Sequence, residues 1–492
     1  MVMHDLISIR DMSRNDLDNL IAEALRIKRG KIDVSGVGRG RKLASLFFEN
    51  STRTRISTET AAENIGMYVN GFAGSEGTSV KKGEPFIDTL RMFDGYGYDV
   101  IAVRHNLAGS ARYAKEMVNA DVINCGDSDN GHPTQADLDL MTIFENMGTI
   151  DGLKIAMIGD LRYGRTVHSL LQGLEHYDAE PWLVAPDVVA MPKWRIDDFE
   201  STTGRRVVIS DNLSEAVANC DVLYMTRVQR ERFPEGAEGE TQYRKASSAF
   251  NLMAEMLKDA KPGMIVMHPL PRYKHNLEIA MDVDDTQHAH YLDQAENGMW
   301  MRMAILSRIL GEGFEGRERN GYGHNGLWEN LPIVDGIKKG EHMVYRLDDG
   351  TLIDHIELGR GRRVEKVLGL DDYRDTEVVA ARNLRSQRYG QKDVIGVSGR
   401  ELTESELSRL ALVSSGATIN IVRDGRVIRK GRIKLPHQID EIVRCQNPKC
   451  ITNPDNHEHV PTKFYVEGQD PLKLRCGYCE TPIGRDELRL NL

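Results

Sequence analysis

The sequence lacks long apolar runs, an excess of basic residues and an even spread of cysteines. No uninterrupted apolar stretch approaches the roughly 20 residues of a membrane span. The first residues show no basic segment followed by an apolar one, so we expect no signal peptide. The formal net charge of −10 argues against general nucleic-acid binding. We therefore expect a cytoplasmic protein with neither nucleic-acid nor membrane partners.

Cysteine is scarce, and its six copies are spread unevenly. Cys125 and Cys220 stand alone. The other four crowd into the C-terminal end: Cys445, Cys450, Cys476 and Cys479. In a cytosolic chain such a cluster predicts a metal site rather than disulfides, and four thiolates favour one tetrahedral structural Zn2+ per chain. Two disulfides, a nucleic-acid zinc ribbon, or ligation by His457 and His459 are the alternatives.

The 492 residues are too many for one ordinary domain, and about three domains of about 150 residues are expected. In the first half, short apolar runs alternate with helical stretches. The runs that we expect as strands are 43–48, 99–103, 121–124, 154–158, 182–185, 222–225 and 264–267. The expected helices are 11–30, 52–65, 137–147, one from residue 166, and 291–310. This rhythm predicts two doubly wound α/β domains with parallel sheets.

Changes in composition and in the pattern of apolar residues predict the domain boundaries. We expect the first α/β domain over 1–150, closed by the helix 291–310, and the second over 151–290. Residues 311–330 are Gly-rich and polar, which is typical of a linker. Beyond them, Asp424-Gly425 predicts a β-hairpin, and Thr403 with Glu406 predicts a capped helix over 403–413. We therefore expect an α+β domain over 331–436 and a small zinc-binding β domain over 437–492.

The run Ser51-Thr52-Arg53-Thr54-Arg55 lies where an expected strand gives way to an expected helix. Free backbone N–H groups at a helix start point toward an anion, and the helix dipole favours negative charge there. Small hydroxyl residues and an arginine add further donors. The run therefore favours a phosphate site, with an ordinary helix cap and exposed arginines as the alternative.

Five further polar residues follow the same pattern in the first domain. Ser79 and Lys82 lie on a Gly-containing loop, and Arg104 directly follows an expected strand. His132 and Gln135 precede an expected helix. Side chains at the C-terminal ends of parallel strands line the ligand crevice of open α/β sheets. Each residue taken alone could equally be a solvated loop residue or a helix-start residue.

The second domain offers a dicarboxylate site. Arg165, Arg227 and Gln229 lie just after expected strands, and the planar guanidinium group binds carboxylates through two parallel hydrogen bonds. Surface ion pairing is the alternative for any single arginine. Leu270 and Pro271 lie in a proline-containing loop after another expected strand, which would fix the direction of their carbonyl groups.

The motifs together are more specific than any one of them. S-T-R-T-R, S-x-x-K-G-E, R-H, H-P-T-Q, G-D-L-R-Y-G-R-T, T-R-V-Q and H-P-L-P-R occur in this order over roughly residues 1–310. The chain thereby resembles the aspartate carbamoyltransferases, catalytic chain, and the resemblance implies the carbamoyltransferase fold. Ornithine carbamoyltransferases typically carry H-C-L-P in the last motif and lack T-R-V-Q.

The resemblance implies a role for each of these residues. The phosphate of carbamoyl phosphate would be bound by Ser51, Thr52, Arg53, Thr54 and Arg104. The carbamoyl oxygen would be polarised by Thr54, Arg104 and His132. Its amine would be held by Gln135 and the carbonyl groups of Leu270 and Pro271. Aspartate would be bound by Arg165, Arg227 and Gln229. Arg55 is left with a structural role, a salt bridge that supports the loop.

The resemblance also implies a shared active site. Ser79 and Lys82 would reach in from a neighbouring subunit, so that the site requires a homotrimer. The Ser79 loop is one residue shorter than in some relatives. Trimers could pair into larger assemblies through the C-terminal part.

From about residue 331 the chain resembles the regulatory chain of the same enzyme. This predicts a natural fusion of a catalytic chain with a regulatory chain. That family binds nucleotides, and Asp354, His355 and Lys430 match its pattern. Gly396 occupies a position where the family typically has a lysine, and the loop 360–363 also differs from the family's sequence pattern. We expect regulation by ATP and CTP, with a domain kept only for assembly as the alternative.

The expected reaction is carbamoyl phosphate plus L-aspartate giving N-carbamoyl-L-aspartate and phosphate, the committed step of pyrimidine synthesis. The resemblance implies no metal or cofactor for catalysis. A carbamoyltransferase for ornithine or a related amine is the first alternative. The second is a non-catalytic regulatory or nucleic-acid-binding protein that retains a degenerate transferase domain.

Overall fold

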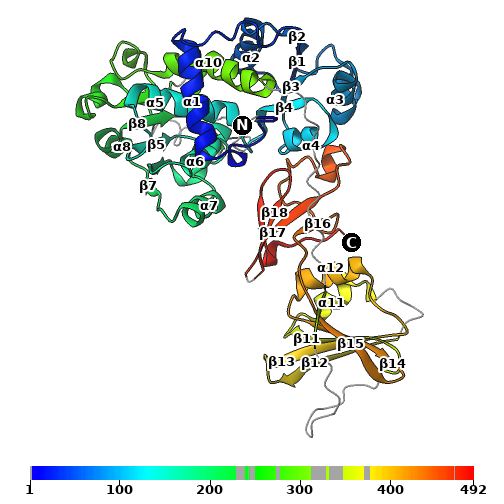
Figure 1. Cartoon of the computed structure of the whole chain (residues 1–492). Coiled ribbons are helices and arrows are strands. Elements are labelled where there is room, and N and C mark those ends of the chain that lie inside the picture. Colours follow the sequence, from blue (N-terminus) through cyan, green and yellow to red (C-terminus); the bar gives the residue numbers. More distant parts are fainter. Residues whose placement is uncertain are drawn as a thin grey trace. The chain divides into compact units, whose positions relative to one another are not determined.

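The computed structural model describes residues 3–228, 236, 239–241, 243, 250–272, 277–311, 328–331, 347–370, 377–469 and 471–491. The chain divides into two compact units, Met1–Glu315 and Gly316–Leu492 (Figure 1). The expected linker 311–330 lies almost entirely outside the described residues.

The first sheet of the N-terminal unit has four parallel strands in the order β2-β1-β3-β4. Its strands are β1 (Lys42–Phe47), β2 (Tyr68–Ala73), β3 (Val100–His105) and β4 (Asp121–Asp127). The sequence predicted all but β2, an edge strand with no buried residue, which therefore shows no apolar run. Gly71 of β2 lies so close to β1 that a Cβ atom there would meet the Ser45 carbonyl oxygen at 1.9 Å.

Six helices among the described residues surround this sheet, and all but α3 and α4 were expected from the sequence. They are α1 (Arg14–Lys28), α2 (Thr52–Asn64), α3 (Phe86–Gly95), α4 (Ser110–Met117), α5 (Pro133–Met147) and α10 (Tyr291–Leu310). The predicted capping box of Ser13 and Asp16 is confirmed at α1. Helix α5 begins four residues before the predicted start, because Pro133 occupies its first turn, where a missing N–H is harmless. Helix α10 packs back onto α1, α2 and α5 (Figure 1).

The second sheet of the unit has five parallel strands in the order β7-β6-β5-β8-β9. Its strands are β5 (Lys154–Ile158), β6 (Glu180–Val184), β7 (Val208–Ser210), β8 (Val222–Met225) and β9 (Ile265–Met267). Helices α6 (Arg165–Leu174), α7 (Lys193–Thr203) and α8 (Leu213–Asn219) connect them. One apolar core cluster runs from Leu43 of β1 through Leu140 of α5 to Tyr224 of β8. The two α/β halves therefore share a core.

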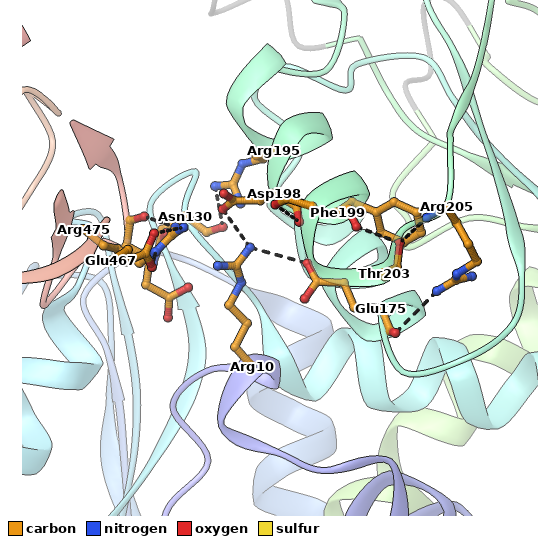
Figure 2. Close-up of polar contacts among 12 residues, drawn as sticks. Arg10, Asn130, Glu175, Arg195, Asp198, Phe199, Thr203, Arg205, Glu467 and Arg475 are labelled. Atoms are coloured by element: carbon orange, nitrogen blue, oxygen red, sulfur yellow. Dashed lines mark hydrogen bonds and ion pairs between the residues drawn. The ribbon is translucent and has the colours of Figure 1, made fainter. Parts of the chain in front are cut away.

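Charged side chains also join the two halves (Figure 2). Arg10, in the short 3-10 helix η1 (Ile9–Asp11), donates from Nη2 to Asp198 of α7 at 3.0 Å and to Glu175, just after α6, at 3.4 Å. Arg195 of α7 donates to the carbonyl oxygen of Asn130, in the loop before α5, at 3.3 Å. The start of the chain and the loop ahead of His132 are thereby fastened to the second half.

The C-terminal unit contains two antiparallel sheets. The larger has the order β10-β15-β14-β11-β13-β12, and the smaller β16-β17-β18-β19. The strands are β10 (Trp328–Asn330), β11 (Gly350–Glu357), β12 (Val378–Ser386), β13 (Gly390–Ser398), β14 (Thr418–Arg423), β15 (Arg426–Ile433), β16 (Gln438–Asp440), β17 (Lys463–Gln469), β18 (Leu472–Cys476) and β19 (Pro482–Gly484). The helices are α11 (Gly361–Val367) and α12 (Glu404–Val413).

The sequence signals of this unit are confirmed. Asp424 and Gly425 form the turn between β14 and β15. Thr403 and Glu406 form the capping box of α12. In the smaller sheet, Arg475 of β18 pairs with Glu467 of β17, with Nη2 and Oε2 3.0 Å apart (Figure 2). Among the helices of the described segments, none has the length and apolarity needed to cross a membrane.

Candidate active site

A cavity of about 790 Å³ lies between the two α/β halves of the N-terminal unit. Its walls come from the segments that follow strands of both sheets and from one face of α10. The residues of the expected site that line it are Ser51, Thr52, Arg53, Thr54, Arg104, His132, Gln135, Arg165, Arg227, Leu270 and Pro271. The structure therefore brings together residues from positions 51 to 271.

Three helices start at this cavity, and none has a side-chain cap. Ser51 is the N-cap of α2, His132 of α5 and Gly164 of α6, and all three line the cavity. The first N–H groups of each helix have no partner within the helix. With the dipoles of α2, α5 and α6 adding a positive potential, the cavity suits an anionic ligand.

At the start of α2, the residues of the run 51–55 differ in whether they face the cavity. Ser51, Thr52, Arg53 and Thr54 line the cavity, whereas Arg55 does not. Arg55 lies 3.7 Å from Glu59 one turn along the helix, and Glu59 accepts a hydrogen bond from Ser45 of β1 at 2.8 Å. These contacts agree with the structural role expected for Arg55.

His132 presents an uncharged imidazole at the cavity. Burial, reinforced by the positive charge of Arg302, lowers its pKa to about 3. Its Nε2 lies 3.3 Å from the hydroxyl oxygen of Thr54. Its backbone N–H donates to Ser169 of α6 at 2.8 Å. The ring can therefore offer a hydrogen bond without carrying a charge.

A buried carboxylate fixes the amide of Gln135. Gln135 donates from Nε2 to Oδ1 of Asp139, one turn along α5, at 2.8 Å, which leaves its Oε1 available as an acceptor. Asp139 also accepts from Gln294 of α10 at 2.7 Å and from Tyr224 of β8 at 2.8 Å. Burial raises the pKa of Asp139 to about 7, against the opposing effect of these hydrogen bonds.

Glu49 gathers two arginines at the mouth of the site. Arg165 donates to its Oε2 at 2.8 Å and also to the Ser128 carbonyl oxygen at 2.8 Å. Arg104 places Nε 3.4 Å from the same Oε2 and donates from Nη1 to the Cys125 carbonyl oxygen at 3.3 Å. Arg104 comes from the first half and Arg165 from the second, so Glu49 sets the distance between the two guanidinium groups.

The loop after β9 forms the opposite wall. His268 accepts from the Leu270 N–H through Nδ1 at 2.7 Å, while its own N–H donates to Gln294 at 2.7 Å. Burial, followed by the charge of Arg272, lowers the pKa of His268 to about 3. One hydrogen bond from the Leu270 N–H to the neutral ring, and one from the His268 backbone N–H to Gln294, therefore hold this loop at the cavity.

Two expected residues lie away from this cavity, and a third is outside the described residues. Ser79 and Lys82 lie on an exposed 3-10 helix, Ser79–Lys82, and do not line it. Gln229 lies outside the described residues. A contribution by Ser79 and Lys82 to this type of site would have to come from another copy of the chain.

The sequence interpretation missed Glu49, Asp139 and Arg302. Glu49 precedes Ser51 by two residues, but its pairing with Arg165 depends on the meeting of the two halves. Arg302 did carry a local signal, because it interrupts an apolar stretch of its helix and a buried charge requires a partner, whereas Asp139 lies among other polar residues of its helix. Arg302 is 3% exposed and lines the cavity.

The C-terminal unit contains the expected cysteine cluster. The sulfur atoms of Cys445, Cys450, Cys476 and Cys479 all lie within 4.8 Å of one another, and the four residues are buried and free of disulfides. The Sγ atoms of Cys445 and Cys479 are 3.5 Å apart, and those of Cys450 and Cys476 are 3.8 Å apart. Tetrahedral zinc with bonds of about 2.3 Å would separate them by about 3.8 Å. Four thiols at this spacing form a structural metal site.

Two of the expected nucleotide residues, Asp354 and Lys430, share one face of the larger sheet. Gly396, Leu352, Asn420 and Lys430 are paired across four adjacent strands, and Asp354 lies two residues beyond Leu352. Asp354 contacts Lys392 at 2.6 Å and His355 at 3.1 Å. Burial raises the pKa of Asp354, but these two partners outweigh it and bring the pKa to about 2. Asp354 is therefore a paired carboxylate.

Comparison with known proteins covers both units. The family model described as "Aspartate/ornithine carbamoyltransferase, carbamoyl-P binding domain" matches residues 4–145, and the "Asp/Orn binding domain" of the same proteins matches 151–309. The "Aspartate carbamoyltransferase regulatory chain, allosteric domain" matches 342–434, and its "metal binding domain" matches 437–489.

Individual relatives agree with these matches. The aspartate carbamoyltransferase catalytic subunit of Thermococcus kodakarensis is 45% identical over 312 residues, which cover 62% of this chain and 97% of the relative. That of Chromobacterium violaceum is 45% identical over 307 residues, 62% and 98% of the two chains. The structure of aspartate transcarbamoylase from Trypanosoma cruzi with carbamoyl phosphate and aspartate has a TM-score of 0.57 and 36% identity, and covers 62% of this chain and 95% of that one.

The paired parallel sheets and the cavity between them are those of the carbamoyltransferase fold. The chain belongs to the aspartate carbamoyltransferase family, and it carries the catalytic and regulatory parts in one polypeptide. It is accordingly an enzyme of the carbamoyltransferase class. The expected domain bounds and the roles of single residues stay predictions.

Proposed function

We propose that the cavity binds carbamoyl phosphate and L-aspartate and transfers the carbamoyl group to the aspartate amine. The observation that carries this proposal is the meeting of three uncapped helix starts and several arginines at one neutral histidine. Two anionic substrates fit such a site, and an uncharged donor beside it can stabilise a developing oxyanion. The products are N-carbamoyl-L-aspartate and phosphate, the committed step of pyrimidine synthesis.

The phosphate would be bound at the start of α2. The N–H groups of its first turn, the hydroxyls of Ser51 and Thr52, and the guanidinium groups of Arg53 and Arg104 supply the donors. Charge-assisted hydrogen bonds of this kind contribute about 1.5–3 kcal/mol each. The carbamoyl oxygen would then lie between Thr54, Arg104 and His132.

The acceptor would be bound from the second half. Arg165 and Arg227 suit the two carboxylates of aspartate, and Gln229 joins them in the proposal by its sequence position alone. Gln135 accepts a hydrogen bond from the carbamoyl amine through Oε1, and the carbonyl groups of Leu270 and Pro271 accept others. Orientation of both substrates could lower the barrier by up to roughly 7–11 kcal/mol.

The reaction requires no protein nucleophile. The aspartate nitrogen forms a bond to the carbamoyl carbon, and the carbonyl oxygen takes the negative charge, which Thr54, Arg104 and His132 stabilise. The bond from carbon to the phosphate oxygen then breaks, and the amine proton passes to the departing phosphate. The chain's residues bind, orient and stabilise charge.

The first test is turnover with alternative amines. We expect the full chain to carbamoylate L-aspartate in preference to ornithine, because arginines rather than carboxylates dominate the acceptor side of the cavity. Product formation from carbamoyl phosphate with each amine, alone and in competition, measures this preference. Turnover of ornithine without turnover of aspartate would overturn the assignment of the acceptor.

Arg53 and Arg55 provide a matched pair for the same assay. Arg53→Ala should lower kcat/KM about 10-fold to 100-fold, because it removes a charge-assisted phosphate contact. Arg55→Ala should stay within about twofold, because its partly exposed ion pair with Glu59 contributes little. An unchanged rate for Arg53→Ala would contradict the phosphate site and favour a non-catalytic role.

We further propose that Ser79 and Lys82 complete the site of a neighbouring subunit in a homotrimer. If so, mixing Lys82→Ala with Arg53→Ala chains under exchange should restore about a quarter of wild-type activity, because mixed trimers rebuild one intact site. Mixing Arg53→Ala with His132→Ala is the control. Both residues belong to the part of the site that one chain supplies, so no mixed trimer rebuilds an intact site. Equal activity of the two mixtures would sink the shared site.

We propose Zn2+ as the metal of the four-cysteine cluster. Metal analysis of the purified chain should find about one zinc ion per chain. Cys476→Ser should lose the ion and melt the smaller sheet at a lower temperature, because a structural zinc site supplies folding free energy to a small domain. Cys220→Ser, which changes a cysteine outside the cluster, is the control. Full-length protein without zinc would contradict the assignment.

We propose that the face with Asp354 and Lys430, together with the adjacent His355, binds ATP and CTP and regulates activity. The aspartate saturation curve should shift when either nucleotide is added. Lys430→Ala should reduce this shift, while the curve measured in the absence of nucleotide stays unchanged. Glycine at position 396 removes one cationic donor from this face, so we expect weak binding. No shift with either nucleotide would leave the domain a role in assembly alone.

A further inference from the structure

The hydroxyl group of Thr134 lies between His132 and Arg302, behind the wall of the cavity. Arg302 of α10 donates from Nη2 to Thr134 Oγ1 at 3.0 Å. The same oxygen lies 3.4 Å from Nδ1 of His132. The three residues are 3%, 0% and 3% exposed for His132, Thr134 and Arg302. Bulk water therefore does not compete for these hydrogen bonds.

The direction of the two hydrogen bonds follows from their chemistry. A guanidinium group has only donors, so Thr134 must be the acceptor toward Arg302. The hydroxyl proton of Thr134 is then free to point at Nδ1 of His132. In the reverse arrangement, an N–H on Nδ1 would point at an oxygen that already accepts from a cation, with the positive charge of Arg302 directly behind it. That arrangement is electrostatically unfavourable in a buried site.

We propose that Arg302 and Thr134 are positioning residues that hold His132 in the tautomer with its proton on Nε2. Nε2 is the nitrogen that lies 3.3 Å from Thr54 at the cavity, so the proton is presented where a polarised carbonyl oxygen would lie. The catalytic consequence rests on the proposed function, whereas the tautomer itself does not.

Two further observations agree with this assignment. The low pKa of His132 leaves a neutral ring, which carries one proton and therefore has a choice of two nitrogens. Arg302 is held by its own helix, because Nη1 donates to the Gly298 carbonyl oxygen at 2.8 Å. The guanidinium group, which also lines the cavity, is thus fixed on the Nδ1 side by two hydrogen bonds.

The hydrogen bonds from Arg302 to Thr134 and from Thr134 to His132 orient the imidazole ring without adding a charge to it. Arg302 does not contact the cavity end of His132, so its effect passes through the Thr134 hydroxyl. Removing that hydroxyl should change which nitrogen carries the proton, while the phosphate donors at the start of α2 stay in place. A merely structural role for Thr134 would affect stability without changing the tautomer.

The test is 15N NMR of the full chain with labelled histidine, comparing wild type, Thr134→Val and Thr134→Ser. We expect the His132 signals of wild type and Thr134→Ser to show a protonated Nε2 and an unprotonated Nδ1. Thr134→Val keeps the side-chain shape and removes the hydroxyl, so it should give a mixture of the two tautomers. The signals are assigned by their loss in His132→Gln.

Kinetics supply a second readout. Thr134→Val should lower kcat about tenfold, with the KM for carbamoyl phosphate changed less than about twofold, and Thr134→Ser should restore most of kcat. A fall in kcat without any change of tautomer would overturn the proposal and indicate a packing role.

Wild type alone can also decide the question. If Thr134→Val fails to fold, a wild-type signal with the proton on Nδ1 still overturns the proposal, and one with the proton on Nε2 supports it. Because the NMR measurement needs no turnover, an inactive chain with the expected tautomer would contradict the proposed function and leave the tautomer assignment intact.

Discussion

The carboxylate of Asp139 connects the parts of the catalytic unit that the active site requires. It accepts hydrogen bonds from Gln135 on its own helix, from Gln294 on α10 and from Tyr224 on β8 of the second sheet. A buried carboxylate that lost these donors would carry the full cost of desolvation. Asp139 therefore links the orientation of the Gln135 amide to both sheets, and through Gln294 and His268 to the wall that carries Leu270.

Around Asp139, the site concentrates positive potential and keeps its histidines neutral. Glu49 balances part of the charge, because it pairs with Arg104 from one half and Arg165 from the other. A cavity lined by arginines would otherwise favour any anion. In the proposed reaction, the cations would bind the charges of the substrates, while His132 would supply a hydrogen bond that does not strengthen ground-state binding of phosphate.

The sequence predicted the parts of the fold and site that depend on neighbouring residues. The start of α2 was readable because Ser51 to Thr54 follow an apolar strand directly, and the four cysteines were readable from their spacing. Edge strand β2 was not predicted, because an exposed strand has no apolar run. The pairing of Glu49 with Arg165 was also invisible, since it joins positions 116 residues apart that meet only after the two sheets share a core.

Burial in the first place, and the positive charge of Arg302 in the second, explain why the neutral state of His132 is stable. Arg302 carries a positive charge, and burial raises the pKa of the neighbouring Asp139 to about 7, so that Asp139 is only partly ionised near neutral pH. Asp137, whose carboxylate has no hydrogen-bond partner among the described residues, is kept protonated near neutral pH because burial raises its pKa to about 8. A second cation at His132 would have no anion to balance it and would lie beside Arg302. The cost of that charge, rather than any contact at the cavity, holds the imidazole uncharged and leaves only the position of its single proton to be set.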